Sequence, residues 1–101
     1  MIDTGASGTA IDENAIKPLG LTPTGSTQIH TPSTRGTAAT CPTYDVAVGI
    51  YHSVSPLLIA TVPVIASDFT GMGFDALVGR DVLQRCLFLY DGVAGTFTIG
   101  F

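Results

Sequence analysis

Apolar residues in this chain fall in short stretches, and clusters of Gly, Pro, Thr and Ser separate these stretches from one another. The clearest stretch has Tyr44, Val46, Val48 and Ile50 at every second position. This period of two is typical of a strand with one face toward a core. Short, punctuated stretches of this kind predict an all-β fold.

The remaining apolar stretches extend this prediction along the chain. Residues 57–65 are almost continuously apolar, which indicates a strand buried on both faces. Asp-Gly at positions 91–92 lies between two further apolar stretches and indicates a C-terminal hairpin. The predicted strands comprise residues 9–11, 26–30, 43–50, 57–65, 87–90 and 96–101.

Two short helices are expected between these strands. Asp12 can cap a helix over residues 13–19, with Gly20 as its stop. Asp81, with Gln84 three positions on, resembles a capping arrangement for a helix over residues 82–86.

The composition narrows the functional classes. A chain of 101 residues with 46% hydrophobic content predicts one domain, residues 1–101, with a modest core. Only 12% of the residues are charged, which favours apolar surface hidden against a partner. The net charge is -4 and Lys and Arg number only 4, so nucleic-acid binding is not expected. No apolar stretch approaches the roughly eighteen residues of a membrane span.

Metal and cofactor chemistry has little support. Cys41 and Cys86 are too few for a disulfide framework, and His30 and His52 are isolated. The Gly-x-Gly-x-x-Ala pattern at residues 71–76 leads into another apolar triplet rather than a helix. We therefore expect no metal and no cofactor. Unpaired cysteines and the lack of a basic-then-apolar leader favour a cytoplasmic setting.

The residue types that carry chemistry are concentrated at the start of the chain. Asp3-Thr4-Gly5-Ala6-Ser7 follows apolar Ile2, and the strand at residues 9–11 comes next. Far along the chain stands Ala76-Leu77-Val78-Gly79-Arg80-Asp81. An Asp-Thr-Gly turn alone is a common solvated turn. The longer match, the following strand and the distant segment together resemble the retroviral-type aspartic proteases, over nearly the whole chain.

This resemblance implies a small closed barrel or sandwich of the retropepsin type, with a flap hairpin and a C-terminal hairpin. It also implies peptide hydrolysis by two carboxyl groups that share one proton, one acting as general base toward water and the other as acid. The chain has a single Asp-Thr-Gly. The dyad must then come from two copies of Asp3 across a two-fold axis, in a homodimer that cleaves extended polypeptides.

The resemblance assigns a role to each matching residue. Asp3, Thr4 and Gly5 form the catalytic turn, with Thr4 reaching the partner loop and Gly5 allowing the substrate backbone to approach. Val78, with its two neighbours, packs beneath this turn. Substrate contacts are expected from Ala6 and Ser7, and from a flap that closes over the peptide. The flap residues are Thr31, Pro32, Ser33, Thr34, Arg35, Gly36 and Thr37. An ordinary surface loop explains this polar segment equally well.

Two departures from the viral pattern are visible. Ser7 stands where many retroviral enzymes have an Asp that pairs with the Arg of the Gly-Arg segment, here Arg80. The Asp-Thr-Gly-Ala-Ser form is more similar to cellular and bacterial members, including the DNA-damage-inducible type. The family normally has two strands before the Asp, and here only two residues precede it, which suggests an N-terminal truncation. The C-terminal hairpin is then expected to supply two strands per subunit to the dimer.

Two alternatives remain open. The chain could be a non-catalytic dimeric module that binds peptides or proteins with the same fold, or an inactive truncated fragment. A shared-proton dyad predicts an activity optimum below neutral, roughly pH 4 to 6, which separates the protease from the binding module.

Overall fold

The computed structural model describes residues 1–29 and 38–101, and this part of the chain consists mostly of β-strands. The all-β prediction is therefore confirmed. The elements are β1 (Thr9–Asp12), α1 (Glu13–Ile16), the 3₁₀ turn η1 (Lys17–Leu19), β2 (Gly25–Ile29), β3 (Ala39–Ile50), β4 (Leu57–Ser67), β5 (Ala76–Leu77), α2 (Arg80–Leu83), β6 (Leu87–Asp91) and β7 (Thr96–Gly100).

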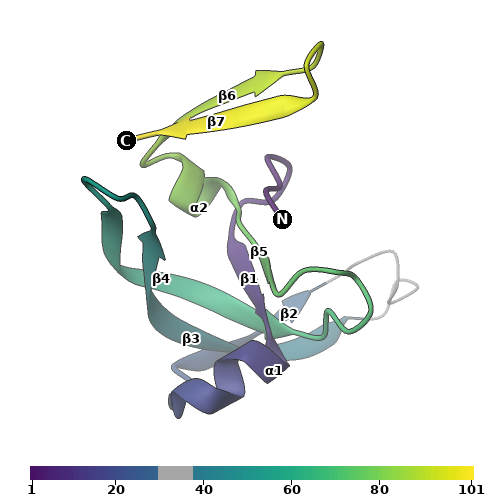
Figure 1. Cartoon of the computed structure of the whole chain (residues 1–101). Coiled ribbons are helices and arrows are strands. Elements are labelled where there is room, and N and C mark those ends of the chain that lie inside the picture. Colours follow the sequence, from purple (N-terminus) through teal and green to yellow (C-terminus); the bar gives the residue numbers. More distant parts are fainter. Residues whose placement is uncertain (30–37) are drawn as a thin grey trace.

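Five of the strands form one sheet in the order β2-β3-β4-β1-β5. The β1 strand lies parallel to β4, with Thr9 opposite Val64, and antiparallel to β5. The sheet thus inserts β1 between two strands that come much later in the sequence. This places the segment that leads into β1, the Asp3 turn, beside the segment that follows β5 (Figure 1).

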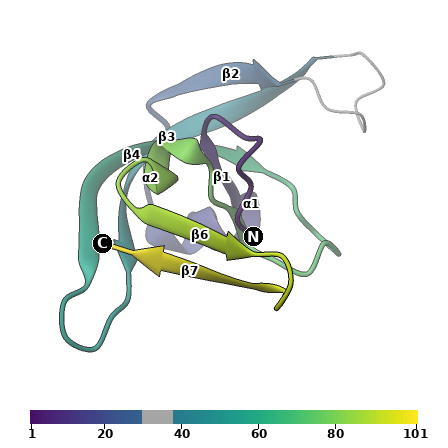
Figure 2. The ribbon, with the colours of Figure 1, turned by 90° about the horizontal axis from the view of Figure 1, so that it is seen from above.

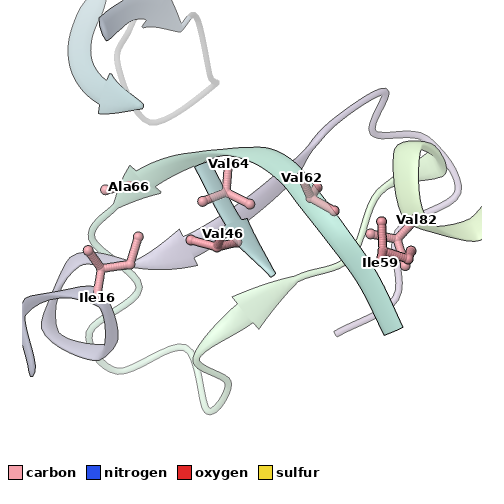
Figure 3. Packing of buried hydrophobic residues seen from close by; sticks show 7 residues of the cluster. All are labelled: Ile16, Val46, Ile59, Val62, Val64, Ala66 and Val82. Atoms are coloured by element: carbon pink, nitrogen blue, oxygen red, sulfur yellow. The ribbon is translucent and has the colours of Figure 1, made fainter. Parts of the chain in front are cut away.

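A small core lies between the sheet and the two short helices (Figure 3). Val64 and Val82 are its most completely buried large side chains. Burying an aliphatic side chain of this kind contributes about 1.5–3 kcal/mol, so each member matters in a domain this small. The buried cluster comprises Ile16, Val46, Ile59, Val62, Val64, Ala66 and Val82.

The prediction that residues 57–65 are buried on both faces is wrong. Ile59 and Val64 are buried, but Leu58 is 71% exposed and Ala60 is also exposed. The pairing of β4 with β3 explains this pattern, because the register shifts between Val46 and Val48. An extra residue in β4 interrupts the alternation there, and only one face of the strand covers the core.

The two predicted helix starts differ from the expected caps. Asp12 stands at the N-cap of α1, but its side chain makes no capping hydrogen bond. Its carboxylate instead accepts a hydrogen bond from the amide of Phe69, 3.3 Å away. The N-cap of α2 is Gly79 rather than Asp81, which lies in the first turn. Gly20 does end the first helical segment, in the left-handed conformation expected of it.

The predicted C-terminal hairpin is confirmed. Within the described part of the chain, β6 and β7 pair only with each other. Asp91 closes the turn, because its Oδ1 accepts hydrogen bonds from the amides of Val93 and Ala94, both at 3.1 Å. In the view of Figure 1 the hairpin lies above α2 and the N-terminal segment, and Figure 2 shows it from that side. Outside residues 30–37, no helix is long and apolar enough to cross a membrane.

Candidate active site

The Asp3 turn is attached to the segment that follows β5. The Asp3 amide donates to the Val78 carbonyl at 2.9 Å, and the Val78 amide donates to the Met1 carbonyl at 2.7 Å. Ile2 and Val78 form an isolated parallel bridge between these hydrogen bonds. Val78 therefore holds the backbone on both sides of Ile2, at Met1 and at Asp3. This is how the structure brings the two matching segments of the sequence together.

Within the turn, the backbone orients the Asp3 carboxylate. The Gly5 amide donates to Asp3 Oδ1 at 2.9 Å, and the Ala6 amide donates to the Asp3 carbonyl at 3.2 Å. A Cβ atom at Gly5 would lie 3.2 Å from Oδ1 and would crowd the carboxylate. Asp3 is half-buried, so its carboxylate is both held and accessible.

Arg80 holds the same turn from the other side. Its Nη1 donates to the Thr4 carbonyl at 3.0 Å, and its backbone amide donates to the Ala6 carbonyl at 2.9 Å. The carboxylate that would pair with this arginine in many viral enzymes is replaced by Ser7, which is exposed. A charge-assisted hydrogen bond to the main chain takes the place of that ion pair.

Gly79 lies in close contact with the turn. A Cβ atom at this position would overlap the Gly8 carbonyl group, 2.6 Å from its carbon, and would lie 3.1 Å from the Ala6 oxygen. Its amide donates to Oγ1 of buried Thr9 at 3.1 Å. Only glycine allows the two segments to approach this closely.

A groove of about 650 Å³ opens beside the turn. Ala6 and Ser7 line it, whereas Asp3 is not among its described lining residues. Several large apolar side chains also line it. Among the residues that the structure describes, the lining comprises Gly5, Ala6, Ser7, Gly8, Ala10, Gln28, Ile29, Ile65, Ser67, Phe69 and Leu77.

A second groove, of about 700 Å³, separates the Asp3 turn from the C-terminal hairpin. Thr4 lines it, together with Met1 and Ile2. The hairpin contributes three aromatic side chains to its other wall, those of Phe88, Tyr90 and Phe97.

The two sequence segments that this geometry brings together lie within a stretch that resembles a known family. A family model described as aspartyl protease matches residues 1–82, from the Asp3 turn to α2. The chain belongs to the aspartyl protease family. Among curated proteins, none matches it. Membership of the aspartyl protease family supports a protease-type hydrolase and implies a peptide substrate.

The sequence-predicted site residues of this aspartyl protease occupy distinct places. Asp3, Gly5 and Val78 lie within one hydrogen-bonded unit, and Thr4 faces the hairpin groove. The predicted flap, Thr31 to Thr37, lies outside the described residues. In the rest of the chain, no group of three or more His, Cys, Asp or Glu side chains is placed to hold a metal ion.

Sequence reasoning missed the contribution of Thr9 and Asp81 to this site. The Asp81 carboxylate accepts hydrogen bonds from Thr9, whose hydroxyl in turn accepts one from Gly79. A polar residue at the start of a buried strand and a carboxylate after Gly-Arg were the available signals. Neither is specific enough to identify such a pair in advance.

Proposed function

We propose that this aspartyl protease is a homodimeric endopeptidase of the retropepsin type, which cleaves extended polypeptides through two copies of Asp3 and an activated water. One observation carries the proposal. The chain holds a single Asp-Thr-Gly turn, and that turn presents its carboxylate in a rigid frame made by Val78, Gly79 and Arg80.

The chemistry requires a second carboxylate beside the first. Two carboxyl groups in contact cannot both be ionised, so they share one proton. The ionised group removes a proton from water, and the protonated group polarises the scissile carbonyl. The Gly5 amide occupies Asp3 Oδ1, and within residues 1–29 and 38–101 the other carboxylate oxygen accepts no hydrogen bond, so it is available for this exchange.

The hairpin groove supports a second copy of the chain as the partner. Thr4 and the aromatic side chains of the hairpin line the same groove, so a second subunit that contacts the Asp3 turn would also cover these aromatic side chains. In the single chain they are open to solvent, with Tyr90 68% and Phe97 56% exposed. An isologous interface buries the same surface on both subunits. The two hairpins would then form the dimer sheet, an arrangement similar to the DNA-damage-inducible type.

Residues Thr31 to Thr37 are proposed as the flap over the bound peptide. In the sequence they begin two positions after Ile29, which lines the groove beside the Asp3 turn. In the proposed enzyme, this flap covers an extended substrate and excludes water from the dyad.

The test is cleavage of a mixed peptide library between pH 4 and 7 by the wild type and by Asp3→Asn. Asparagine retains an oxygen for the Gly5 amide but cannot act as the base. We expect cleavage by the wild type and none by Asp3→Asn. A matched control, Asp45→Asn, changes an exposed carboxylate on β3 and leaves cleavage intact.

Two results would contradict the proposal. Cleavage that persists in Asp3→Asn would assign the activity to another residue or to a contaminant. A folded wild-type dimer that cleaves no peptide would favour the peptide-binding module.

A further inference from the structure

One peptide group of the Asp3 turn is hydrogen-bonded on both of its sides. The peptide that joins Thr4 to Gly5 accepts from Arg80 Nη1 at its carbonyl, at 3.0 Å, and donates from its N–H to Asp3 Oδ1, at 2.9 Å. The C=O and N–H groups of a trans peptide are fixed in one plane and point in opposite directions. The Arg80 guanidinium and the Asp3 carboxylate therefore bind opposite sides of one rigid group.

The same group is the central peptide of a tight turn. The Ala6 amide donates to the Asp3 carbonyl at 3.2 Å, which closes a four-residue turn with Thr4 and Gly5 in the middle. Type I and type II turns differ mainly in the orientation of the central peptide, and type II needs a positive φ at the third residue, where glycine is preferred. Gly5 is not in the left-handed region. The structure thus shows one of two peptide orientations that this sequence allows.

The orientation of this peptide decides what the Asp3 carboxylate meets. In the observed orientation the Gly5 N–H donates to Oδ1 and fixes the carboxylate. In the flipped orientation the Thr4 carbonyl would turn toward the carboxylate in place of the N–H, and neither group could donate a hydrogen to the other. The torsion angle that orients a carboxylate is only weakly restricted by itself. Without the Gly5 N–H, the Asp3 carboxylate would therefore adopt several orientations.

Arg80 favours the observed orientation. Its hydrogen bond to the Thr4 carbonyl is charge-assisted, and such bonds are about twice as strong as neutral ones. The flipped peptide would move this carbonyl away from the guanidinium and lose the bond. The positive charge also polarises the peptide and strengthens the Gly5 N–H as a donor. The main-chain amide of Arg80 donates to the Ala6 carbonyl at 2.9 Å, which keeps the residue beside the turn.

We propose that Arg80 is a positioning residue for the dyad, which keeps the Thr4–Gly5 peptide in the orientation that directs its N–H at Asp3. This inference rests on the proposed endopeptidase function and adds a residue to the machinery of the same site. The Arg80 side chain is exposed, so it has little share in the core. Its loss is therefore expected to affect the chemical step more than the stability of the fold.

The first experiment separates kcat from KM, with a peptide that the wild type cleaves. Arg80→Met removes the charge and the donor, and kcat is expected to fall by about tenfold or more, the effect of losing one charge-assisted hydrogen bond, while KM changes little. Arg80→Lys returns a cationic donor to a contact that uses a single nitrogen, and it is expected to recover most of the lost kcat. Arg85→Met, which removes the charge of an exposed arginine just after α2, is the matched control and leaves both constants unchanged.

Sedimentation velocity on the same samples separates this effect from dimerisation. The kcat values are expressed per dimer, at protein concentrations where each variant is dimeric. An Arg80→Met protein with the wild-type kcat per dimer overturns the positioning role. An equal fall of kcat in Arg80→Met and Arg85→Met also overturns it, since the cause would then be the net charge.

A second measurement follows the peptide itself and does not depend on activity. Hydrogen exchange of the Gly5 amide, measured by NMR, reports whether its N–H is bonded to Asp3. The rate is expected to rise by about fivefold or more in Arg80→Met, because the flipped peptide is open to exchange, and to stay near the wild-type rate in Arg80→Lys and Arg85→Met. An unchanged Gly5 rate in Arg80→Met overturns the assignment.

The two readouts distinguish failure of this inference from failure of the proposed function. A wild type that cleaves nothing, with a Gly5 exchange rate that depends on Arg80, overturns the endopeptidase and supports the hold of Arg80 on the peptide. Cleavage by the wild type, with neither kcat nor exchange dependent on Arg80, overturns the role of Arg80 alone. A wild type that cleaves nothing and a Gly5 rate that is indifferent to Arg80 overturn both.

Discussion

Asp81 and Thr9 lie 72 positions apart in the sequence and form two hydrogen bonds with each other. Asp81 Oδ2 accepts from the Thr9 amide at 3.0 Å, and Oδ1 accepts from the Thr9 hydroxyl at 2.6 Å. Oδ1 also accepts from the Val82 amide at 2.8 Å. One carboxylate thereby joins the start of β1 to the first turn of α2. The Asp3 turn comes shortly before Thr9 in the sequence, and Gly79, whose amide donates to the Thr9 hydroxyl, comes two positions before Asp81.

The Thr9 hydroxyl is predicted to be essential for this junction. Thr9→Val removes a group that donates to Asp81 and accepts from Gly79, and it leaves a buried amide without a partner. We expect a loss of about 1–3 kcal/mol in the free energy of unfolding. Urea denaturation followed by circular dichroism measures it.

Thr9→Ser is the matched control for this change. Serine keeps the hydroxyl and loses one methyl group, which costs about 0.8 kcal/mol. If Thr9→Val and Thr9→Ser lower stability equally, the hydrogen bonds contribute nothing beyond packing.

Gly79 is predicted to tolerate no side chain. In Gly79→Ala the added methyl group would overlap the Gly8 carbonyl, and the atoms that it meets belong to the backbone and cannot rotate away. We expect a loss of about 3 kcal/mol or more in stability, with peptide cleavage abolished in any protein that still folds. Thermal denaturation and the peptide assay report the two effects.

Gly8→Ala tests whether the effect is specific to Gly79. A Cβ atom at Gly8 meets no other atom within 4 Å, and the Gly8 backbone is not in the left-handed region. We therefore expect stability close to that of the wild type. A Gly8→Ala protein as unstable as Gly79→Ala would show that the turn rejects any substitution.

Local pattern was sufficient to predict most strands, but not their pairing. The alternation around Val46 and Val48 predicted β3, because the polarity of each residue in a strand indicates which face of the sheet its side chain is on. The bulge in β4 was not predictable, since it depends on which residue of β3 lies opposite. Burial on both faces was inferred from composition alone and was wrong for this reason.

The candidate site divides in the same way. Asp3 to Ser7 are contiguous, so the turn and its resemblance were visible in the sequence. The Thr9–Asp81 pair and the bond from Arg80 to the Thr4 carbonyl join residues more than 70 positions apart. Such pairs have no local signature, and Asp81 was accordingly interpreted as a helix cap.

The hairpin face is predicted to hold the dimer together. Phe97→Glu places a charge in the aromatic wall beside Thr4, where burial against a partner would remove its hydration. We expect the dimer to weaken by about 2 kcal/mol or more, roughly a 30-fold rise in its dissociation constant. Sedimentation velocity measures this, and cleavage should fall in parallel because in the proposed homodimer each subunit supplies half of the dyad.

The control for Phe97→Glu is Leu58→Glu. Leu58 is also an exposed apolar residue, but it belongs to β4 and lines neither groove. The Leu58→Glu protein should dimerise and cleave as the wild type does. A Phe97→Glu protein that remains dimeric would place the interface elsewhere.

Asp68 is predicted to titrate below an ordinary aspartate. Two hydrogen bonds to its carboxylate lower its pKa. The larger effect comes from the Thr70 hydroxyl and the smaller from the Thr70 amide, which lies 2.9 Å away. Thr70→Val removes the hydroxyl and should raise the pKa of Asp68 toward the ordinary value, as measured by carbon NMR of the carboxyl group. The pKa of Asp68 is lower in the folded protein than in the unfolded chain. Its contribution to the free energy of unfolding is therefore present above the unfolded-state pKa and is lost as the pH falls through the folded-state pKa. Asp68 is exposed, so this effect is small.

The pH dependence of cleavage is predicted to follow the shared proton of the dyad rather than any surface carboxylate. Activity should be greatest below neutral, at about pH 4–6, because one Asp3 must hold a proton while its mate does not. It should fall at higher pH as the shared proton is lost, and at lower pH as both groups become protonated. The measurement is kcat/KM between pH 3.5 and 8, with circular dichroism at each pH to exclude unfolding. Thr70→Val should give the same profile as the wild type, since it alters only Asp68. Activity that rises steadily toward pH 8 would be incompatible with two carboxyl groups sharing one proton.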